Sequence, residues 1–228
     1  GPPEKPAVLF DYDPSRGGAV PERLLEGFTG VLQADGYSGY NRVCQREGIT
    51  RIGCFDHARR KFVEASRASE SKGVRTKAAQ PSKADVALGK IRKLYAIEKA
   101  CRPLSDAERL VKRQSQSRAV IDALRQWLDE VLPSVPPGSV LGGALGYLHR
   151  QWPRLIGYLE RGDLPIDNNP AENAIRPFVV GRKAWLFADT QAGAHASALI
   201  YSLLETAKAN GMEPYLWLRT VLRALPAA

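Results

Sequence analysis

The chain has 228 residues, of which 44% are hydrophobic, and its 33 Lys and Arg outnumber 24 Asp and Glu to give a pI near 9.6. This length allows one large domain or one domain with an insertion. No run of the sequence reaches the roughly 18 apolar residues that a membrane-spanning helix needs, and the three cysteines form no paired framework. The composition therefore argues against a membrane protein and a disulfide-stapled scaffold, and it favours a cytoplasmic protein.

The positive charge is concentrated in one stretch. Residues 57–118 contain 17 Lys and Arg and 6 Asp and Glu, a net charge of +11, so the rest of the chain carries about −2. A basic arm on a nearly neutral body is typical of a protein that binds a polyanion, although an ordinary solvated helical face can have the same composition. The charge pattern favours nucleic acid as the partner.

Strand and helix signals alternate at the start of the chain. In chain order we expect a strand at 7–12, a turn at 13–18, a helix at 21–28, a strand at 30–34, a helix at 37–47 closed by Gly48, a strand at 49–54 and a helix that begins at 55. Such alternation predicts an α/β layout with parallel strands.

Helical periodicity replaces the strand signal from about residue 63 to 161. Helices are expected at 86–102, 105–132 and 140–159, with a proline-rich break at 131–138. Beyond Pro177, the segment Phe178–Phe187 is expected to be extended, and two helices follow at 192–210, capped by Gly211, and at 214–225. We therefore predict that a basic helical insertion interrupts an α/β core.

Two acidic residues from distant segments are candidate metal ligands. Asp35 follows the apolar run Gly30–Ala34 and precedes Gly36, and Glu172 lies in the first turn of a short helix rich in Asn and Arg. Carboxylates brought together in this way hold Mg²⁺ in many phosphoryl-transfer sites. Plainer explanations are open, because an Asp before Gly also forms turns and Glu172 also fits a capping box behind Asn169. Asp167 is a rival ligand, but it precedes the helix, where we expect its geometry to be less fixed.

Basic residues that could hold phosphate occur in two places. The first is the start of a helix at His57, with Arg59, Arg60 and Lys61. The second is Arg182 and Lys183, which lie beside Trp185 and could grip a DNA backbone while the indole stacks on a base. Cys54 and His57 have the spacing of half a zinc site, but no second Cys/His pair follows, so zinc is not expected.

Taken in order, several sequence blocks resemble one known family. They are Leu32-Gln-Ala-Asp-Gly-Tyr37, Cys54-Phe-Asp-His-Ala-Arg-Arg-Lys-Phe62, Ile166-Asp-Asn-Asn-x-Ala-Glu-x-Ala-Ile-Arg-Pro177, Gly181-Arg-Lys183 and Ile200-Tyr-Ser-Leu-Leu-Glu-Thr-Ala-Lys-x-Asn-Gly211. Together they are similar to the transposases of the bacterial Insertion Sequence 66 family. The resemblance covers nearly the whole chain, and the Asn-Asn-x-Ala-Glu and Cys-x-x-His-x-Arg-Arg blocks are specific in combination.

The resemblance implies an RNase H-like fold whose Asp-Asp-Glu triad binds two Mg²⁺ (or Mn²⁺) ions. Asp35 matches the second Asp of the triad and Glu172 the Glu, 137 residues further on. By the same resemblance, other residues would bind DNA (Arg59, Arg60, Lys61, Arg176, Arg182, Lys183) or support the site (Cys54, His57, Asn168, Asn169). The implied partners are DNA at transposon ends and targets, further copies of the chain and accessory proteins of the same element. The implied location is the bacterial nucleoid.

The family's first Asp lies upstream of any matching residue here, and Asp11 and Asp13 are poor replacements. We therefore expect Ala7–Tyr12 to be the third strand of a core that lacks its first two, and the chain to be an inactive part of a transposase. The expected divisions are a partial core at 1–62, the insertion at 63–163, the Glu-bearing segment at 164–190 and C-terminal helices at 191–228. A non-catalytic DNA-binding remnant and an RNase H-like nuclease remain alternatives.

Overall fold

The computed structural model describes residues 5–71, 81–185 and 188–225 and is mostly helical. It divides into two compact units. The first, called here the strand–bundle unit, comprises residues 21–168. The second, the terminal unit, is made of residues 169–225 together with the chain up to residue 20. In the described part of the chain, no helix combines the length and hydropathy needed to cross a bilayer.

A short parallel sheet begins the strand–bundle unit after helix α1 (Ala19–Leu24). Strand β1 (Gly30–Gln33) pairs with β2 (Ile49–Ile52), with Gly30 opposite Ile49 and Gln33 opposite Ile52. The ladder continues for one further bond, from the amide of Ala34 to the carbonyl of Ile52 at 3.1 Å. The two expected strands and their parallel pairing are therefore confirmed, and they form the sheet seen in the described residues.

The connection between the strands is not the helix expected at 37–47. It consists of two short 3₁₀ turns, η1 (Ser38–Tyr40) and η2 (Val43–Gln45). An α-helix starting at Tyr37 would use the carbonyl of Tyr37 to accept from the amide of Asn41. That carbonyl accepts instead from Arg51 Nη2 at 2.9 Å, and the Asn41 amide bonds to the carbonyl of Ser38. A tertiary contact from β2 thus overrides the local helical pattern.

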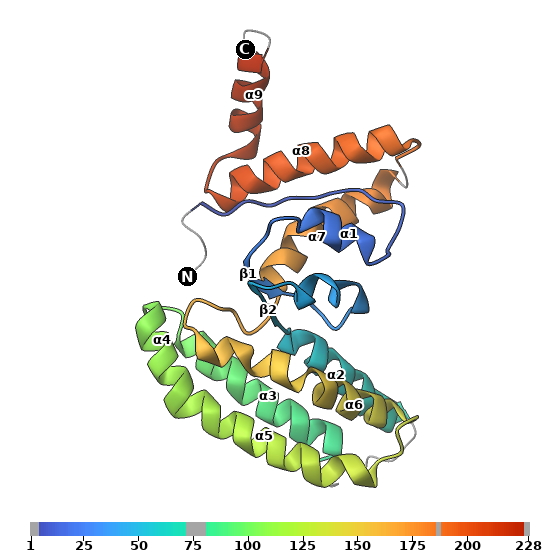
Figure 1. Cartoon of the computed structure of the whole chain (residues 1–228), viewed down its shortest axis with the longest axis vertical. Coiled ribbons are helices and arrows are strands. Elements are labelled where there is room, and N and C mark those ends of the chain that lie inside the picture. Colours follow the sequence, from blue (N-terminus) through green and yellow to red (C-terminus); the bar gives the residue numbers. More distant parts are fainter. Residues whose placement is uncertain (1–4, 72–80, 186–187, 226–228) are drawn as a thin grey trace. The chain divides into compact units, whose positions relative to one another are not determined.

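Four helices pack around the main hydrophobic core (Figure 1). They are α2 (Phe55–Ser71), α3 (Lys83–Ala100), α5 (Arg118–Val131) and α6 (Val140–Leu155). Phe62, Leu94, Leu124 and Leu148 contribute one fully buried side chain from each helix. Ser82 caps α3 through a capping box with Asp85, as the sequence rules for helix starts anticipate. The helices expected within residues 63–161 are therefore present, and they pack in the same compact unit as the two strands.

A buried arginine, Arg113, lies at the π-helical turn between helices α4 (Asp106–Lys112) and α5. Helix α4 runs into this turn, η3 (Arg113–Ser117), and then into α5. Arg113 is 1% exposed and pairs with Glu98 of α3 through Nη2–Oε2 at 2.6 Å and Nε–Oε1 at 2.8 Å. Its Nη1 donates to the carbonyls of Tyr158 and Arg161, which follow α6 in the 3₁₀ turn η5 (Ile156–Glu160) and the next loop. Arg113 therefore ties three segments together.

The terminal unit contains helices α7 (Asn169–Trp185), α8 (Gln191–Ala209) and α9 (Pro214–Ala224). The expectation of an extended segment from Phe178 onward is wrong up to Trp185, because α7 continues through Pro177; Phe187 lies outside the described residues. The ring of Phe178 packs edge-on against Tyr201 of α8, with centroids 5.2 Å apart. Helix–helix packing therefore stabilises a sequence whose β-branched valines resemble a strand.

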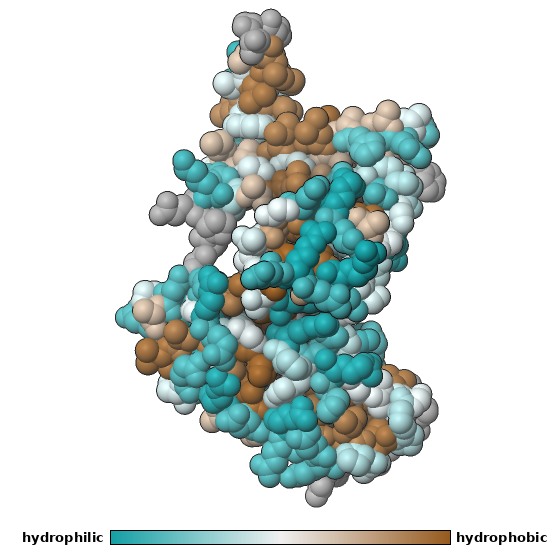
Figure 2. All heavy atoms as spheres, viewed as in Figure 1, coloured by the Kyte–Doolittle hydropathy of each residue, from teal (hydrophilic) through white to brown (hydrophobic). Residues whose placement is uncertain are grey.

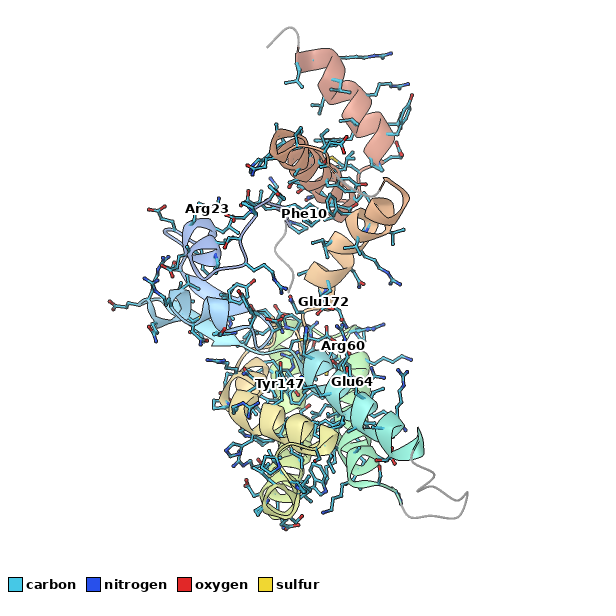
Figure 3. All side chains as sticks on the ribbon, turned by 90° about the vertical axis from the view of Figure 1, so that its right-hand side faces the viewer. Phe10, Arg23, Arg60, Glu64, Tyr147 and Glu172 are labelled. Carbon is cyan, nitrogen blue, oxygen red and sulfur yellow. The ribbon has the colours of Figure 1, made fainter. Side chains whose placement is uncertain are left out.

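The segment 7–12 is extended but does not join a sheet, so the prediction of a strand there is wrong. Its backbone bonds to side chains of α8: Ser202 Oγ accepts from the amide of Phe10 at 2.7 Å, and Thr206 Oγ1 accepts from the amide of Val8 at 2.9 Å. Asn210 Nδ2 donates to the carbonyl of Pro6 at 2.8 Å. Figure 3 shows Phe10 beside α8. Polar side chains at helical spacing thus replace the neighbouring strand.

Apolar side chains on the two last helices remain exposed. Leu199 and Leu203 of α8 are 61% and 41% exposed, and Leu216 and Leu222 of α9 are 50% and 57% exposed. Figure 2 shows hydrophobic surface over both helices. The residues buried on α8 are small ones, Ala198, Ser202 and Ala207. The terminal unit therefore has a much thinner core than the strand–bundle unit.

Candidate functional site at the end of strand β1

Asp35 lies at the carboxyl end of β1, as the sequence predicts. The residue before it, Ala34, is 4% exposed and the last to bond to β2, whereas Asp35 itself is half-buried. Parallel strands present their carboxyl ends at one edge of a sheet, and ligand sites of α/β proteins collect at that edge. The fold therefore gives a carboxylate a rigid base and an accessible position.

The turn after Asp35 is held by its own side chain and by Arg51 of β2. Asp35 Oδ1 accepts a hydrogen bond from the amide of Tyr37 at 3.0 Å, which forms an Asx turn. Arg51 Nη2 donates to the carbonyl of Asp35 at 2.7 Å and Nη1 donates to Asn41 Oδ1 at 2.9 Å. One guanidinium therefore binds both ends of the segment 35–41.

Tyrosines and cations surround the carboxylate. Burial raises the pKa of Tyr147 on α6, and the nearby negative charge of Asp35 raises it further. The pKa of Tyr40 rises for the same two reasons, in the same order. Burial, followed by the charge of Arg154, lowers the pKa of Arg51. The Lys61 ammonium lies 5.1 Å from the centre of the Tyr147 ring. The site therefore combines one acid with aromatic and basic neighbours.

A second stretch of chain binds at the same end of the sheet. Gln33 Nε2 donates to the carbonyl of Pro165 at 2.9 Å, and the amide of Phe55 donates to the carbonyl of Ile166 at 3.1 Å. The amide of Asn168 donates to Cys54 Sγ at 3.3 Å. Burial raises the pKa of the Cys54 thiol. Cys54 and Asn168, two residues predicted to support the site, are thus in contact, and the cysteine acts here as a hydrogen-bond acceptor for backbone.

Asp167 is better fixed than its sequence position suggested. It is 8% exposed, and it raises the pKa of Tyr95 on α3, for which burial is the larger cause. The sequence placed Asp167 ahead of a helix, where its geometry was expected to be loose. Its burial against the bundle instead gives the segment before Glu172 a firm attachment within the strand–bundle unit.

The predicted phosphate-binding residues on α2 are placed in its first two turns. Arg60 is paired with Asp56 at 2.7 Å, and Arg59 lies 3.6 Å from the same carboxylate. Both arginine side chains remain about half exposed. Figure 3 shows Arg60 on α2 and Tyr147 on the neighbouring α6. His57 lies in the same first turn, half-buried. Both predicted phosphate-binding arginines are therefore accessible at the start of α2, where they contact Asp56.

Glu172 lies in the first turn of α7, as predicted. The helix begins at Asn169, one residue earlier than the capping-box reading required, and Arg176 is exposed one turn after Glu172. The side chains of Arg182 and Lys183 lie outside the described residues. Because Glu172 belongs to the terminal unit and Asp35 to the strand–bundle unit, the expected meeting of the two acids stays a prediction.

Sequence reasoning missed Arg51 and Tyr147. Arg51 occupies a half-buried strand position whose only sequence signal is the alternation of Ile49-Thr-Arg-Ile52. Tyr147 lies 112 residues after Asp35, within a helical pattern that is also typical of core. Both contacts depend on strand register and on how α6 packs, which are long-range properties.

Comparison with known proteins covers nearly the whole chain. The family described as "Transposase IS66 family" matches residues 1–196, and the "IS66 C-terminal element" matches residues 202–228. Among curated relatives, the uncharacterized protein y4hP of Sinorhizobium fredii (strain NBRC 101917 / NGR234) is 30% identical over 224 residues, which are 95% of this chain and 40% of that protein. The uncharacterized protein y4qI of the same strain is 31% identical, with the same two coverages.

The chain therefore spans about 40% of the length of these relatives. No solved structure matches the chain. The matched range 1–196 includes Asp35, the Cys54 and His57 block and Glu172. The chain belongs to the IS66 family of transposases.

Proposed function

We propose that this chain forms part of a DDE-type transposase that cleaves DNA and joins its ends by two-metal phosphoryl transfer. The observation that carries the proposal is the position of Asp35 at the end of a parallel strand, in a chain that matches the IS66 family over residues 1–196. By the family pattern, Asp35 and Glu172 are the carboxylates of the site. An RNase H-like core is proposed with it, in which β1 and β2 are adjacent parallel strands.

The chemistry of Asp35 suits a divalent cation. Mg²⁺ and Mn²⁺ prefer oxygen ligands from carboxylates and water. The Tyr37 amide donates to Oδ1 of Asp35 at 3.0 Å, which helps to fix the side-chain rotamer of this carboxylate. Glu172 would supply the second carboxylate. When bound, the cations would activate a water or a DNA 3′-hydroxyl and neutralise charge on the phosphate.

Phosphate binding is assigned to basic residues of α2 and α7. On α2 these are Arg59, Arg60 and Lys61, and on α7 they are Arg176, Arg182 and Lys183. The two arginines on α2 are half exposed, so a phosphodiester could reach them. The net charge of +11 over residues 57–118 supports the same partner. We also propose that the protein forms homo-oligomers on DNA and works with accessory proteins of the element. Only the family supports these two partners.

A non-catalytic DNA-binding role is the second candidate, and the basic bundle favours it independently of the acids. Lys90, Arg92 and Lys93 on α3 add positive charge to the same helical bundle. Binding through such a surface needs no metal. The two functions therefore differ in what the carboxylates do when DNA is present.

DNA affinity with and without a cation separates the two functions. We would measure the anisotropy of a labelled duplex, in EDTA and in Mn²⁺, for the wild type and for Asp35→Asn/Glu172→Gln. The catalytic role predicts that Mn²⁺ strengthens binding by the wild type only, and that in EDTA the variant binds at least as tightly because two repulsive charges are gone. An equal Mn²⁺ effect on both proteins would favour the non-catalytic role. Gel analysis of products would distinguish joined strands from simple hydrolysis by a nuclease.

A further inference from the structure

The acid at the end of β1 is held by residues from two other elements of the strand–bundle unit. Arg51 belongs to β2, where it lies opposite Leu32 in the parallel register. Tyr147 belongs to α6, in the helical insertion. Neither residue is carried by the sequence blocks that resemble the family, and neither is a plausible metal ligand. Both residues contact the segment 35–41.

Arg51 acts as a clamp on that segment. Its Nη2 donates to the carbonyls of Asp35 at 2.7 Å and Tyr37 at 2.9 Å, and its Nη1 donates to Asn41 Oδ1 at 2.9 Å. The guanidinium also lies 5.6 Å from the centre of the Tyr40 ring. A side chain with its donors in a rigid fork can satisfy several acceptors at fixed angles, which Lys cannot do. Removing it would free the backbone on both sides of the Asx turn.

Tyr147 closes the opposite side. A Cβ placed on Gly36 would lie 2.8 Å from Tyr147 Cε2 and 3.2 Å from its Oη, so the ring packs directly on the backbone of Gly36. Tyr147 also packs against the main hydrophobic core, which fixes its ring. The bundle therefore forms one wall of the turn that carries Asp35, and any side chain at position 36 would push this wall away.

We propose that Arg51 and Tyr147 are positioning residues for Asp35: the guanidinium closes the turn behind the carboxylate, and the tyrosine ring holds Gly36 from the side of the helical insertion. The importance of that position for a metal site rests on the proposed function. The clamp itself rests on the contacts of the strand–bundle unit alone. The insertion thus contributes to the geometry of the acid as well as to the basic surface.

Amide hydrogen exchange tests the clamp without metal or DNA. The Tyr37 amide donates to Asp35 Oδ1, so its protection reports the carboxylate's rotamer. Arg51→Gln should speed exchange of this amide about tenfold, because the net contribution of one hydrogen bond to stability corresponds to a change of about that factor in the opening equilibrium. Arg46→Gln is the matched control, since Arg46 also donates to two backbone carbonyls, those of Leu25 and Glu22, away from the turn. Unchanged exchange in Arg51→Gln, or equal acceleration in both variants, would overturn the proposal.

Variants on the other wall provide an independent readout. Tyr147→Ala and Gly36→Ala should each speed exchange of the Tyr37 amide. Tyr147→Phe keeps the ring but loses the hydroxyl that bonds to the backbone of Gly36, so it should speed exchange less than Tyr147→Ala does. Gly36→Ala leaves Arg51 intact, so it still tests whether contacts around the turn hold Asp35 if Arg51→Gln does not fold. Wild-type exchange in both Gly36→Ala and Tyr147→Ala would contradict the role of Tyr147.

Calorimetric titration with Mn²⁺ then connects the clamp to the site. Arg51→Gln and Tyr147→Ala should bind Mn²⁺ at least several-fold more weakly than the wild type, while Tyr147→Phe, which keeps the ring, should bind it more tightly than Tyr147→Ala does. A wild type that takes up no Mn²⁺ would count against the proposed function, and the exchange rates would still decide the clamp. Full Mn²⁺ affinity in Arg51→Gln, with a freely exchanging Tyr37 amide, would refute the claim that the clamp positions Asp35 for a cation.

Discussion

Arg113 offers the sharpest test of how the strand–bundle unit is held together. The perturbation is Arg113→Met, which keeps an unbranched, apolar side chain in the space and removes the charge. Arg113 is 1% exposed, and the side chain of its partner Glu98 is 13% exposed. The variant would leave Glu98 nearly buried without its cation, and the carbonyls of Tyr158 and Arg161 without their donor. The cation–π contact with the Tyr158 ring, at 4.9 Å, would also be lost.

Breaking a buried ion pair by removing one partner costs about 3–5 kcal/mol. We expect Arg113→Met to lower the free energy of unfolding by about that amount. Arg113→Met/Glu98→Met should recover part of the loss, because no carboxylate is stranded. The two carbonyls stay unpaired in the double variant, so recovery should be incomplete, since each unsatisfied group costs about 1–3 kcal/mol before relaxation.

The assay is urea unfolding of the whole chain followed by far-ultraviolet circular dichroism and tryptophan fluorescence. Arg125→Met is the matched control, because Arg125 also donates two hydrogen bonds to one carboxylate, that of Asp129. This pair lies on the surface, with side chains 35% and 51% exposed. That control should cost at most about 1 kcal/mol. Equal losses for Arg113→Met and Arg125→Met would refute the reasoning, and so would a double variant less stable than Arg113→Met.

Three further predictions concern other segments. Ser105 lowers the pKa of Glu108 through hydrogen bonds from its hydroxyl and its amide. This cap therefore stabilises the fold above the ordinary pKa of Glu, and its contribution is lost as the pH falls through the lowered value. Ser105→Ala should raise the pKa of Glu108 in an NMR titration, and an unchanged pKa would contradict the cap. Ser202→Ala should speed exchange of the Phe10 amide, which donates to the serine oxygen at 2.7 Å; unchanged exchange would mean that this bond does not hold the segment. Burial raises the pKa of the Cys54 thiol, so iodoacetamide should alkylate it only after unfolding, as mass spectrometry would show; rapid alkylation of the folded chain would refute its burial.

Local patterns predicted the parts of the fold that local forces decide. Apolar runs located β1 and β2 to within a residue or two, and the position of Asp35 followed from the Gly that ends the run. Gly211 closes α8 with a φ of 74°, a conformation that favours glycine. The long helices of the bundle also followed from periodicity, because each buries a wide apolar face.

The errors occur where distant residues decide the backbone. Arg51 takes the carbonyl of Tyr37 that a helix would need, and Phe178 packs on α8 in a sequence that looks extended. Segment 7–12 has strand-like alternation, but hydroxyls of α8 bond its backbone. Neither the composition nor the spacing of residues in the sequence indicates these long-range partners. For the same reason the contacts of Tyr147 with the Asp35 turn could not be predicted.

Calorimetric binding of Mn²⁺ to the chain tests the central claim most directly, that Asp35 and Glu172 form one cation site. The comparison is between the wild type, Asp35→Asn/Glu172→Gln and the control Asp129→Asn/Glu130→Gln, which removes the same charge from two exposed positions on α5. We expect uptake by the wild type and the control, and loss of uptake in the Asp35 and Glu172 variant. Absence of uptake by the folded wild type, or equal uptake by all three proteins, would contradict it.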